Sequence, residues 1–259
     1  MHMRPSKVLQ KLRAGNAVSC VKMNLSDSRA VEIAALAGFD CVWADMEHVP
    51  NDLCVVERQV LAAKTHGVDT MVRVSRGGYS DYVRPLELDA AGIMVPHVMG
   101  VEDARRVVKM ARFHPVGLRP VDGGNADGAF CAVEFNDYLA EANRERFLIV
   151  QIEDWEPLAE LDEIAALDGV DMLFFGPADF SQSIGAPGQW NHPAIADGRK
   201  RVAEAALRHG KFAGTVGGTA NLPELLELGY RFLSVGADVV GLGQYFRGLV
   251  SQFAKICGE

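Results

Sequence analysis

The chain has 259 residues, of which 49% are hydrophobic and 23% are charged, with 26 glycines and 11 prolines. This composition excludes disordered, collagen-like and coiled-coil proteins, and it predicts a sizeable buried core. The 34 acidic residues outnumber the 26 lysines and arginines, the net charge is −8, and no run of like charge forms a basic stripe. Nucleic acid and membranes are therefore not expected partners.

The cysteines and the apolar runs indicate the cellular compartment of the protein. The five cysteines are scattered and include no C-x-x-C pair, which argues against a disulfide framework and a thiolate zinc site. No apolar run approaches the roughly 20 residues of a membrane span, and the first residues lack a secretory signal. We therefore expect a cytoplasmic protein.

Short runs rich in β-branched or aromatic residues alternate with longer segments of helical period, which predicts β–α units and a parallel sheet. The predicted strands are Ala17–Met23, Phe39–Asp45, Asp69–Val74, Gly92–Pro96, Phe147–Glu153, Val170–Phe175, Lys211–Val216 and Arg231–Val235. The predicted helices are Ser28–Ala37, Asp52–Thr65, Ser80–Asp89, Val101–Arg112, Glu156–Ala166, Pro193–His209, Leu222–Leu228 and Asp238–Ile256. Eight such units predict an α/β fold, a (β/α)₈ TIM barrel forming a single domain over residues 1–259. The alternative, an open doubly wound sheet, lacks the usual Gly-x-Gly-x-x-Gly after its first strand.

One stretch does not fit the alternation. Residues Phe113 to Ala132, between the fourth helix and the fifth strand, are rich in glycine and proline and are too long for a simple connection. Loops of that length are usually functional or mobile.

Polar residues gather at the carboxyl ends of the predicted strands, where barrels of this kind build their active sites. These residues are Asp45, Glu47 and His48 after strand two, Arg73 on strand three, His97 after strand four, Gln151 and Glu153 on strand five, and Asp179 after strand six. Gln151 and Glu153 are two positions apart, so their side chains share one face. A carboxylate buried in the barrel needs a cationic side chain or a metal. Glu153 and Asp179 together suit a divalent ion, and oxygen donors favour Mg²⁺ or Mn²⁺.

Each residue alone also has a more ordinary interpretation. Glu153 would form an ion pair with an arginine, Asp179 would cap a short helix, and Arg73 would be a salt-bridge partner. His48 would be a loop histidine, and His97 would either line the pocket or make a structural hydrogen bond. The convergence of five strand ends favours the functional interpretation.

Four segments resemble the signature segments of the HpcH/HpaI aldolase family, relatives of the citrate lyase β subunit: Phe39–His48, Met71–Val74, Gln151–Glu153 and Gly176–Ser181. The resemblance extends from about Val18 to about Val240. It implies a class II aldolase that depends on Mg²⁺, Mn²⁺ or Co²⁺ and cleaves or forms 4-hydroxy-2-oxo acids, with pyruvate as keto product or donor. It also implies a homo-oligomer, a hexamer built from dimers, in which the terminal helix packs on a neighbouring barrel.

The resemblance also implies roles for individual residues. Glu153 and Asp179 become metal ligands, Arg73 the substrate-binding arginine, His48 the base, and Asp45 the partner of His48. Glu47, in the same segment, is implied to orient a water or His48. The implied substrate contacts are Arg73, Gln151, Gly176, Pro177, Ala178, Asp179 and Val216.

The chain departs from the family pattern at one place. The segment from Gly117 to Gly124 has no serine where many relatives carry one near the pyruvate carboxylate. A neighbouring subunit's Arg119–Asp122 segment is a candidate to complete the site.

Three alternatives remain open at this point. Lys22, near the end of strand one, would be the Schiff-base lysine of a class I aldolase. It would otherwise pair with Glu47 or Asp45, or reach a distal carboxylate of the substrate. A second possibility is carbon–carbon lyase chemistry on an acyl-CoA thioester, and a third is a catalytically silent barrel that serves as a binding module.

Overall fold

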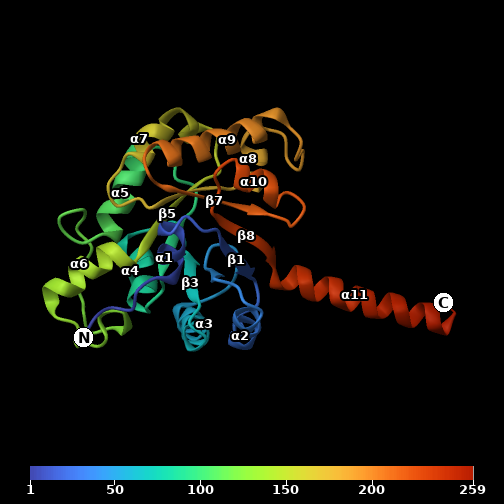
Figure 1. Cartoon of the computed structure of the whole chain (residues 1–259), viewed down its shortest axis with the longest axis horizontal. Helices are drawn as coiled ribbons and strands as arrows, with labels where there is room; N and C mark the ends of the chain where they lie inside the picture. Colours follow the sequence, from blue (N-terminus) through green and yellow to red (C-terminus); the bar gives the residue numbers. More distant parts are fainter. Residues whose placement is uncertain (259) are drawn as a thin grey trace.

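The computed structural model describes residues 1–258 and contains a closed barrel of parallel strands in sequence order (Figure 1). The strands are β1 (Val18–Met23), β2 (Cys41–Asp45), β3 (Asp69–Arg73), β4 (Gly92–Val95), β5 (Phe147–Ile152), β6 (Met172–Phe175), β7 (Phe212–Gly217) and β8 (Phe232–Ala237). Strand β8 pairs with β1 and closes the barrel. The predicted TIM barrel is confirmed, and each predicted strand is present with its ends shifted by at most about two residues.

Helices follow the strands as predicted, with additions. They are α2 (Ser28–Leu36), α3 (Leu53–Thr65), α4 (Tyr79–Glu87), α5 (Val101–Ala111), α7 (Leu161–Ala165), α9 (Pro193–Arg208), α10 (Leu222–Glu227) and α11 (Asp238–Cys257). The helix predicted over Glu156–Ala166 begins as a 3₁₀ segment, η2 (Glu156–Glu160), and becomes α-helical only in α7. Three helices were not predicted: α1 (Lys7–Arg13), α6 (Phe135–Glu145) and α8 (Pro177–Ser183). The stretch predicted to be irregular contains only the short 3₁₀ helix η1 (Ala126–Gly128) among its residues.

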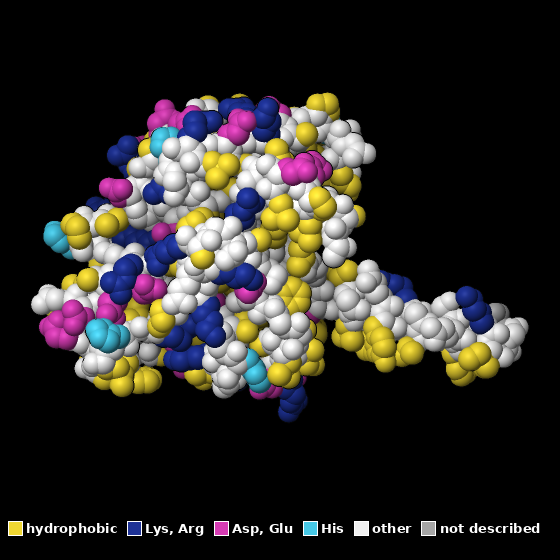
Figure 2. All heavy atoms as spheres, viewed as in Figure 1, with side chains coloured by type: hydrophobic (Ala, Val, Ile, Leu, Met, Phe, Trp, Pro, Cys, Tyr) yellow, Lys and Arg dark blue, Asp and Glu magenta, His cyan; other side chains and the backbone are white. Residues whose placement is uncertain are grey.

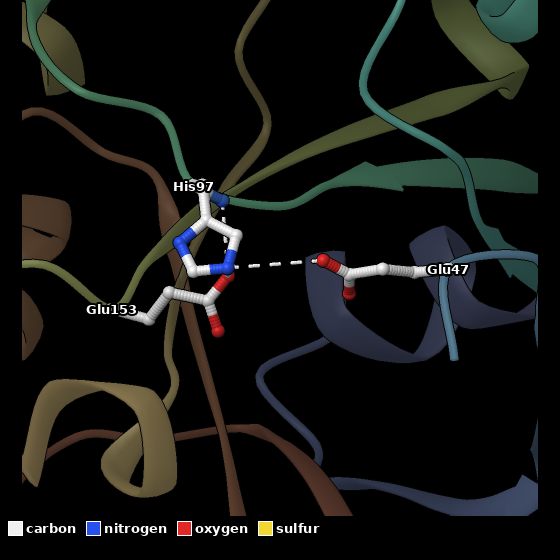
Figure 3. A group of neighbouring side chains, drawn as sticks. All are labelled: Glu47, His97 and Glu153. Atoms are coloured by element: carbon white, nitrogen blue, oxygen red, sulfur yellow. Dashed lines mark hydrogen bonds and ion pairs between the residues drawn. The ribbon is translucent and has the colours of Figure 1, made fainter. Parts of the chain in front are cut away.

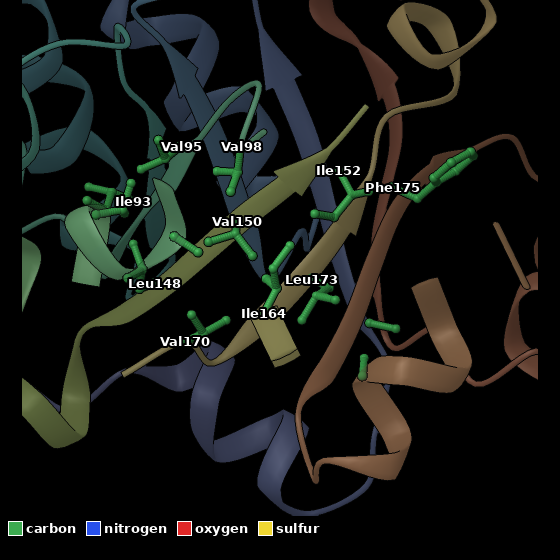
Figure 4. Close-up of a cluster of buried hydrophobic side chains, with 14 of the residues drawn as sticks. Ile93, Val95, Val98, Leu148, Val150, Ile152, Ile164, Val170, Leu173 and Phe175 are labelled. Atoms are coloured by element: carbon green, nitrogen blue, oxygen red, sulfur yellow. The ribbon is translucent and has the colours of Figure 1, made fainter. Parts of the chain in front are cut away.

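Alternate residues of each strand face the barrel interior or the surrounding helices. On β5, Leu148, Val150 and Ile152 pack outward against the helical layer (Figure 4). Phe147 and Ile149 belong instead to the interior cluster, which includes residues of seven other elements. This alternation places Gln151 inside the barrel, so the predicted shared inward face of strand five is confirmed by packing.

The amino-terminal end of the barrel is closed by α1. Its Val8, Leu9 and Leu12 pack into the interior cluster. The buried carboxylate of Asp69 accepts hydrogen bonds from Ser6 Oγ at 2.8 Å and from the Val8 backbone N–H at 2.9 Å. Because apolar side chains and hydrogen bonds fill the amino-terminal end, a cavity lined by polar residues can form only at the carboxyl-terminal end of the strands.

Helix α11 departs from the barrel pattern. Asp238 accepts hydrogen bonds from the backbone N–H groups of Asn24 and Leu25 and so fixes the start of the helix beside β1. The helix then projects away from the barrel (Figure 1), and none of its residues is buried against the described part of the chain. Among residues 1–258, no helix has the length and apolar character required to cross a bilayer.

The barrel interior leaves no room for a side chain at Gly92. A Cβ atom at this position would lie 2.1 Å from the ring of Phe147, its partner on β5. We expect Gly92→Ala to lower the free energy of unfolding by about 2–3 kcal/mol, because an overpacked interior forces its neighbours off their rotamers. Urea unfolding of the purified protein measures this loss.

The matched control is Gly78→Ala, at an exposed position where a Cβ would contact nothing within 4 Å. It should change the free energy of unfolding by less than about 1 kcal/mol. Equal destabilisation by both substitutions would contradict the packing argument.

Candidate active site

A cavity of about 440 Å³ lies at the carboxyl ends of the strands. The residues predicted from the sequence that line it are Lys22, His48, Arg73, Gln151, Gly176, Pro177, Ala178, Asp179 and Val216. Asp45 and Glu153 contact these lining residues from buried positions. The structure therefore brings the residues of separate strand ends to one site, as the barrel topology requires.

The two-residue repeat of the strands explains which side chains reach the cavity. Arg73 lies two positions after Met71, and Gln151 two positions after Ile149; both apolar residues are in the interior cluster. On these two strands, the last inward position thus lies above the apolar interior and lines the cavity.

Asp45 is held by two cations. Arg73 donates to it from Nε at 3.0 Å and from Nη2 at 2.6 Å, and Lys22 Nζ lies 2.9 Å from the same Oδ2 that accepts from Nη2. Burial raises the pKa of this carboxyl, but Arg73 and then Lys22 outweigh burial and lower the pKa to about 2. Asp45 is therefore ionised across the physiological range, and the predicted pairing of Lys22 with Asp45 is observed.

The structure does not bring Asp45 and His48 together. Both carboxylate oxygens of Asp45 are engaged by Arg73. The His48 side chain is 56% exposed, and its Nε2 lies 3.5 Å from Glu47 Oε2. In this structure the carboxylate next to the imidazole is Glu47, and the implied role of Asp45 as partner of His48 stays a prediction.

Glu153 has a buried carboxylate that forms no ion pair with a lysine or an arginine among the described residues. Its Oε1 accepts from the His97 backbone N–H at 2.9 Å, and its Oε2 accepts from Gln151 Nε2. Burial raises the pKa of Glu153 to about 7, against the effect of His97, and the nearby Asp179 and Glu47 raise it further. The predicted ion pair between Glu153 and an arginine is absent from the described residues.

His97 has a larger part in this site than its sequence position indicated. Its Nδ1 lies 2.9 Å from Asp154 Oδ2, and its Nε2 lies 3.8 Å from Glu47 Oε1 and 3.8 Å from Glu153 Oε1 (Figure 3). Its backbone φ of 48° is in the left-handed region, which is uncommon for residues other than glycine. Its place at the end of β4 was the signal that could have found it.

The residues around Glu153 fit a divalent cation. Ligand atoms of Glu47, His97 and Glu153 all lie within 4.8 Å of one another. A buried carboxylate with a raised pKa is destabilised in its charged form, and a bound cation removes that penalty. The contact of His97 with Asp154 also matches the arrangement in which a carboxylate fixes the tautomer of a metal-binding histidine.

The arginine of the irregular stretch does not reach this site. Arg119 is buried, donates to Asp127 Oδ2 at 2.9 Å, and its guanidinium lies 4.5 Å from the centre of the Phe113 ring. Within its own subunit the charge of Arg119 is therefore paired with Asp127, and the expectation that the Arg119–Asp122 segment completes the site of a neighbouring subunit stays a prediction.

Comparison with known proteins agrees with this geometry. The chain matches the model of the HpcH/HpaI aldolase/citrate lyase family over residues 20–243. A hydroxypyruvate/pyruvate aldolase from Pseudomonas aeruginosa is 35% identical over 98% of this chain and 94% of its own length. A 2-keto-3-deoxy-L-rhamnonate aldolase from Klebsiella pneumoniae is 34% identical over 84% of this chain and 82% of its own. The crystal structure of an HpcH/HpaI aldolase from Desulfitobacterium hafniense has a TM-score of 0.90 at 32% identity, covering 95% of this chain and 96% of that one.

Gly176 gives the Glu153 carboxylate its space. A Cβ at this position would lie 2.7 Å from Glu153 Oε2 and 2.9 Å from Gln151 Nε2. We expect Gly176→Ala to weaken Mn²⁺ binding by about 10- to 100-fold, because it displaces a carboxylate that would hold the ion. Titration followed by electron paramagnetic resonance of free Mn²⁺ measures the affinity.

The control is Gly218→Ala, just after the next strand, where a Cβ would contact nothing within 4 Å. This variant should bind Mn²⁺ as the unaltered protein does. Undiminished binding in Gly176→Ala would show that the ion is not held at Glu153.

Proposed function

We propose that this chain, which belongs to the HpcH/HpaI aldolase/citrate lyase family, is a divalent-metal-dependent aldolase that cleaves 4-hydroxy-2-oxo acids to pyruvate and an aldehyde, or runs this reaction in reverse. The predicted family and its enzyme class, carbon–carbon lyase, are confirmed by the family match and by the aldolase relatives. The observation that carries the proposed chemistry is the buried Glu153 carboxylate, with its raised pKa, beside a cavity that Arg73 also lines.

Glu153 and Asp179 are the ligands we assign to the ion, which is Mg²⁺, Mn²⁺ or Co²⁺. Glu47 and His97 lie close enough to Glu153 to contribute further donors. When bound, the ion supplies a Lewis acid that draws electrons from the 2-oxo group of the substrate. Oxygen-rich ligands without cysteine match the preference of these ions.

Arg73 binds the negative charge that develops on the substrate. Asp45 holds it through two hydrogen bonds, and Glu47 Oε2 lies 2.9 Å from its Nη1. A guanidinium fixed in this way needs no reorganisation when the C3–C4 bond breaks and the electron pair moves toward the 2-oxo oxygen. We therefore assign Asp45 the role of positioning Arg73.

The wall formed by β5 and β6 orients the 2-oxo acid. Gln151 lines the cavity beside Glu153 and is placed to contact the keto group. Residues Gly176 to Asp179 line the same wall around the start of α8. Pro177 has no backbone N–H and that of Gly176 donates to Ile152 O at 3.0 Å, so we assign the backbone N–H groups of Ala178 and Asp179 to the substrate carboxylate. Val216, on β7, supplies an apolar contact.

His48 is the base in this proposal. Its side chain lines the cavity, is largely exposed, and has only Glu47 as a nearby carboxylate. A neutral imidazole nitrogen can accept a proton, which suits removal of the proton from the C4 hydroxyl. As that proton moves to His48, the C3–C4 bond breaks, the aldehyde is released, and C3 takes up a proton to give pyruvate.

The other two interpretations are less well supported. A catalytically silent barrel would retain several buried charges at its mouth without any ligand, and such groups are destabilising on their own. A lyase acting on an acyl-CoA thioester is disfavoured because the sequence relatives that cover most of this chain are named as aldolases of keto acids.

We also propose that the protein is a homo-oligomer in which α11 packs on a neighbouring barrel, consistent with a hexamer. Hydrophobic side chains lie along the projecting helix (Figure 2). The exposed apolar residues of α11 are Val239, Val240, Leu242, Tyr245, Phe246, Leu249, Val250, Phe253 and Ile256. An apolar face of this extent is unusual on a monomer and marks an interface.

The barrel offers this helix a matching surface. Because α11 leaves the barrel, the outer surface between β8 and β1 lacks the covering helix that a (β/α)₈ fold normally places there, while Val21 and Met23 of β1 pack against α2. Two grooves lie over these strands, lined by Val18, Leu226, Leu233 and Val235 in one and by Val21, Phe39 and Val235 in the other. We propose that the apolar face of α11 from a second copy packs into these apolar grooves.

The assignment of the metal ligands predicts the effect of neutralising them. Glu153→Gln and Asp179→Asn should each lower pyruvate release from a 4-hydroxy-2-oxo acid by about 100-fold or more, because each removes a charged ligand. The assay follows pyruvate with lactate dehydrogenase, after EDTA treatment and after return of Mg²⁺, Mn²⁺ or Co²⁺.

The controls Glu163→Gln and Asp168→Asn neutralise exposed acids outside the cavity and should leave the rate unchanged. Full activity in Asp179→Asn with loss in Glu47→Gln would move the ion to the group formed by Glu47, His97 and Glu153. Activity that survives EDTA would overturn the metal-dependent mechanism.

The oligomer proposal predicts that a charge on the apolar face of α11 breaks the assembly. Leu249→Glu should shift the mass measured by light scattering toward the monomer, because burying an unpaired carboxylate is unfavourable. Ser251→Glu places the same charge on the opposite side of the helix and should leave the mass unchanged. A monomeric unaltered protein would contradict the proposal.

A further inference from the structure

Lys22 lies on the wall of the cavity that faces away from the assigned metal ligands. It is on β1, and in a closed barrel of eight strands in sequence order β1 stands opposite β5, the strand that leads to Glu153. Both walls line the same cavity. A substrate whose 2-oxo acid end is held at β5 and β6 therefore extends toward β1 and β8.

The wall around Lys22 is rich in hydrogen-bond donors. Trp43 is the neighbour of Lys22 in the pairing of β1 with β2, and Ser234 on β8 lines the cavity beside them. The Trp43 side chain is 3% exposed, and its Nε1 has no hydrogen-bond acceptor among the described residues. A buried indole N–H without an acceptor is costly, and a ligand that supplies an acceptor removes this cost.

Lys22 retains donors for such a ligand. An ammonium group has three N–H donors. Among residues 1–258 the one carboxylate in contact with Lys22 is that of Asp45, which also holds Arg73 through the same oxygen, Oδ2. The Lys22 side chain is 22% exposed, so a molecule in the cavity can reach it. The charge on Lys22 is thus only partly balanced by Asp45.

We propose that Lys22 determines which aldehyde the enzyme uses, by binding a carboxylate at the far end of the aldehyde part of the substrate, with Trp43 Nε1 as a second donor. This inference rests on the proposed aldolase function and specifies its substrate class: aldehydes that carry a carboxylate. An ammonium facing a carboxylate in a partly buried site forms a charge-assisted hydrogen bond, and an uncharged aldehyde leaves both donors unmatched.

The same contacts argue against Lys22 as a Schiff-base nucleophile. Such a lysine must lose its proton before it attacks a carbonyl carbon. Lys22 Nζ lies 2.9 Å from Asp45 Oδ2 and 5.4 Å from the centre of the Trp43 ring, so its nitrogen is held in contact with a carboxylate and an aromatic face.

The test compares aldehydes matched in size. Aldol addition of pyruvate is measured with glyoxylate against glycolaldehyde, and with succinic semialdehyde against butanal, in the metal-loaded full-length protein. In the unaltered enzyme kcat/KM should favour the acidic member of at least one pair by about tenfold or more, equivalent to about 1.4 kcal/mol. Lys22→Met should reduce this ratio by about tenfold, whereas Lys22→Arg should keep it within about threefold.

Trp43→Phe gives an independent variant, since it keeps the ring and removes only the indole N–H; it should lower the same ratio by about threefold. A ratio that Lys22→Met leaves unchanged overturns the proposal. Equal loss with both aldehydes of a pair also overturns it, because Lys22 would then act only through Asp45 and Arg73. Borohydride trapping of pyruvate on Lys22 would establish a nucleophile in place of a specificity residue.

Exchange of the pyruvate methyl protons with deuterium from solvent, measured without any aldehyde, separates this inference from the proposed function. Exchange that depends on the metal, together with no preference for acidic aldehydes, overturns the role of Lys22 alone. Absence of both exchange and aldol addition in the unaltered enzyme overturns the proposed function and this inference with it.

Discussion

The two-residue alternation of side chains along the barrel strands determines both the core and the site. On β5 the inward positions run from Phe147 through Ile149 to Gln151, passing from the apolar interior to the cavity. The same step occurs on β3, where Met71 is followed by Arg73. Because the interior below is filled, a polar side chain at the last inward position can only face the open end, where eight strands bring their ends together.

The charges at that end divide into two groups that differ in how they are balanced. Asp45 is matched by Arg73 and Lys22, and the pKa of its carboxyl is lowered to about 2. Glu153 is surrounded by a backbone N–H, an amide and other carboxylates, and its pKa is raised to about 7. The first group pairs its carboxylate with two cationic side chains, and the second is the group to which we assign the metal ion. In a retro-aldol reaction a base removes the proton of the C4 hydroxyl, and electrons move toward the 2-oxo oxygen. A fixed positive charge near that oxygen stabilises the transition state.

The sequence predicts the barrel and most of the residues of the site, because strand alternation and position at strand ends are local properties. Apart from the pairing of Lys22 with Asp45, one of the alternatives considered for this lysine, it does not predict which polar groups pair. Asp45 and His48 are three positions apart, but β2 ends between them, and their side chains diverge toward Arg73 and Glu47. His97 shows the converse: its contact with Glu153 joins β4 to β5 across 56 positions, so no pattern within one segment reveals it.

For helix α11, too, the sequence predicts the element but not its packing partner. Its apolar stripe has the period of a helix that covers a sheet, and a periodic stripe specifies that a face will be buried without specifying on which barrel. The deciding feature lies at its start, where Asp238 bonds to the backbone after β1 and directs the helix outward. The residues around that turn, Ala237 and Val240, also line the cavity beside Lys22. The wall to which we assign selection of the aldehyde is therefore continuous with the helix to which we assign the contact between subunits, so the two proposals concern one corner of the barrel.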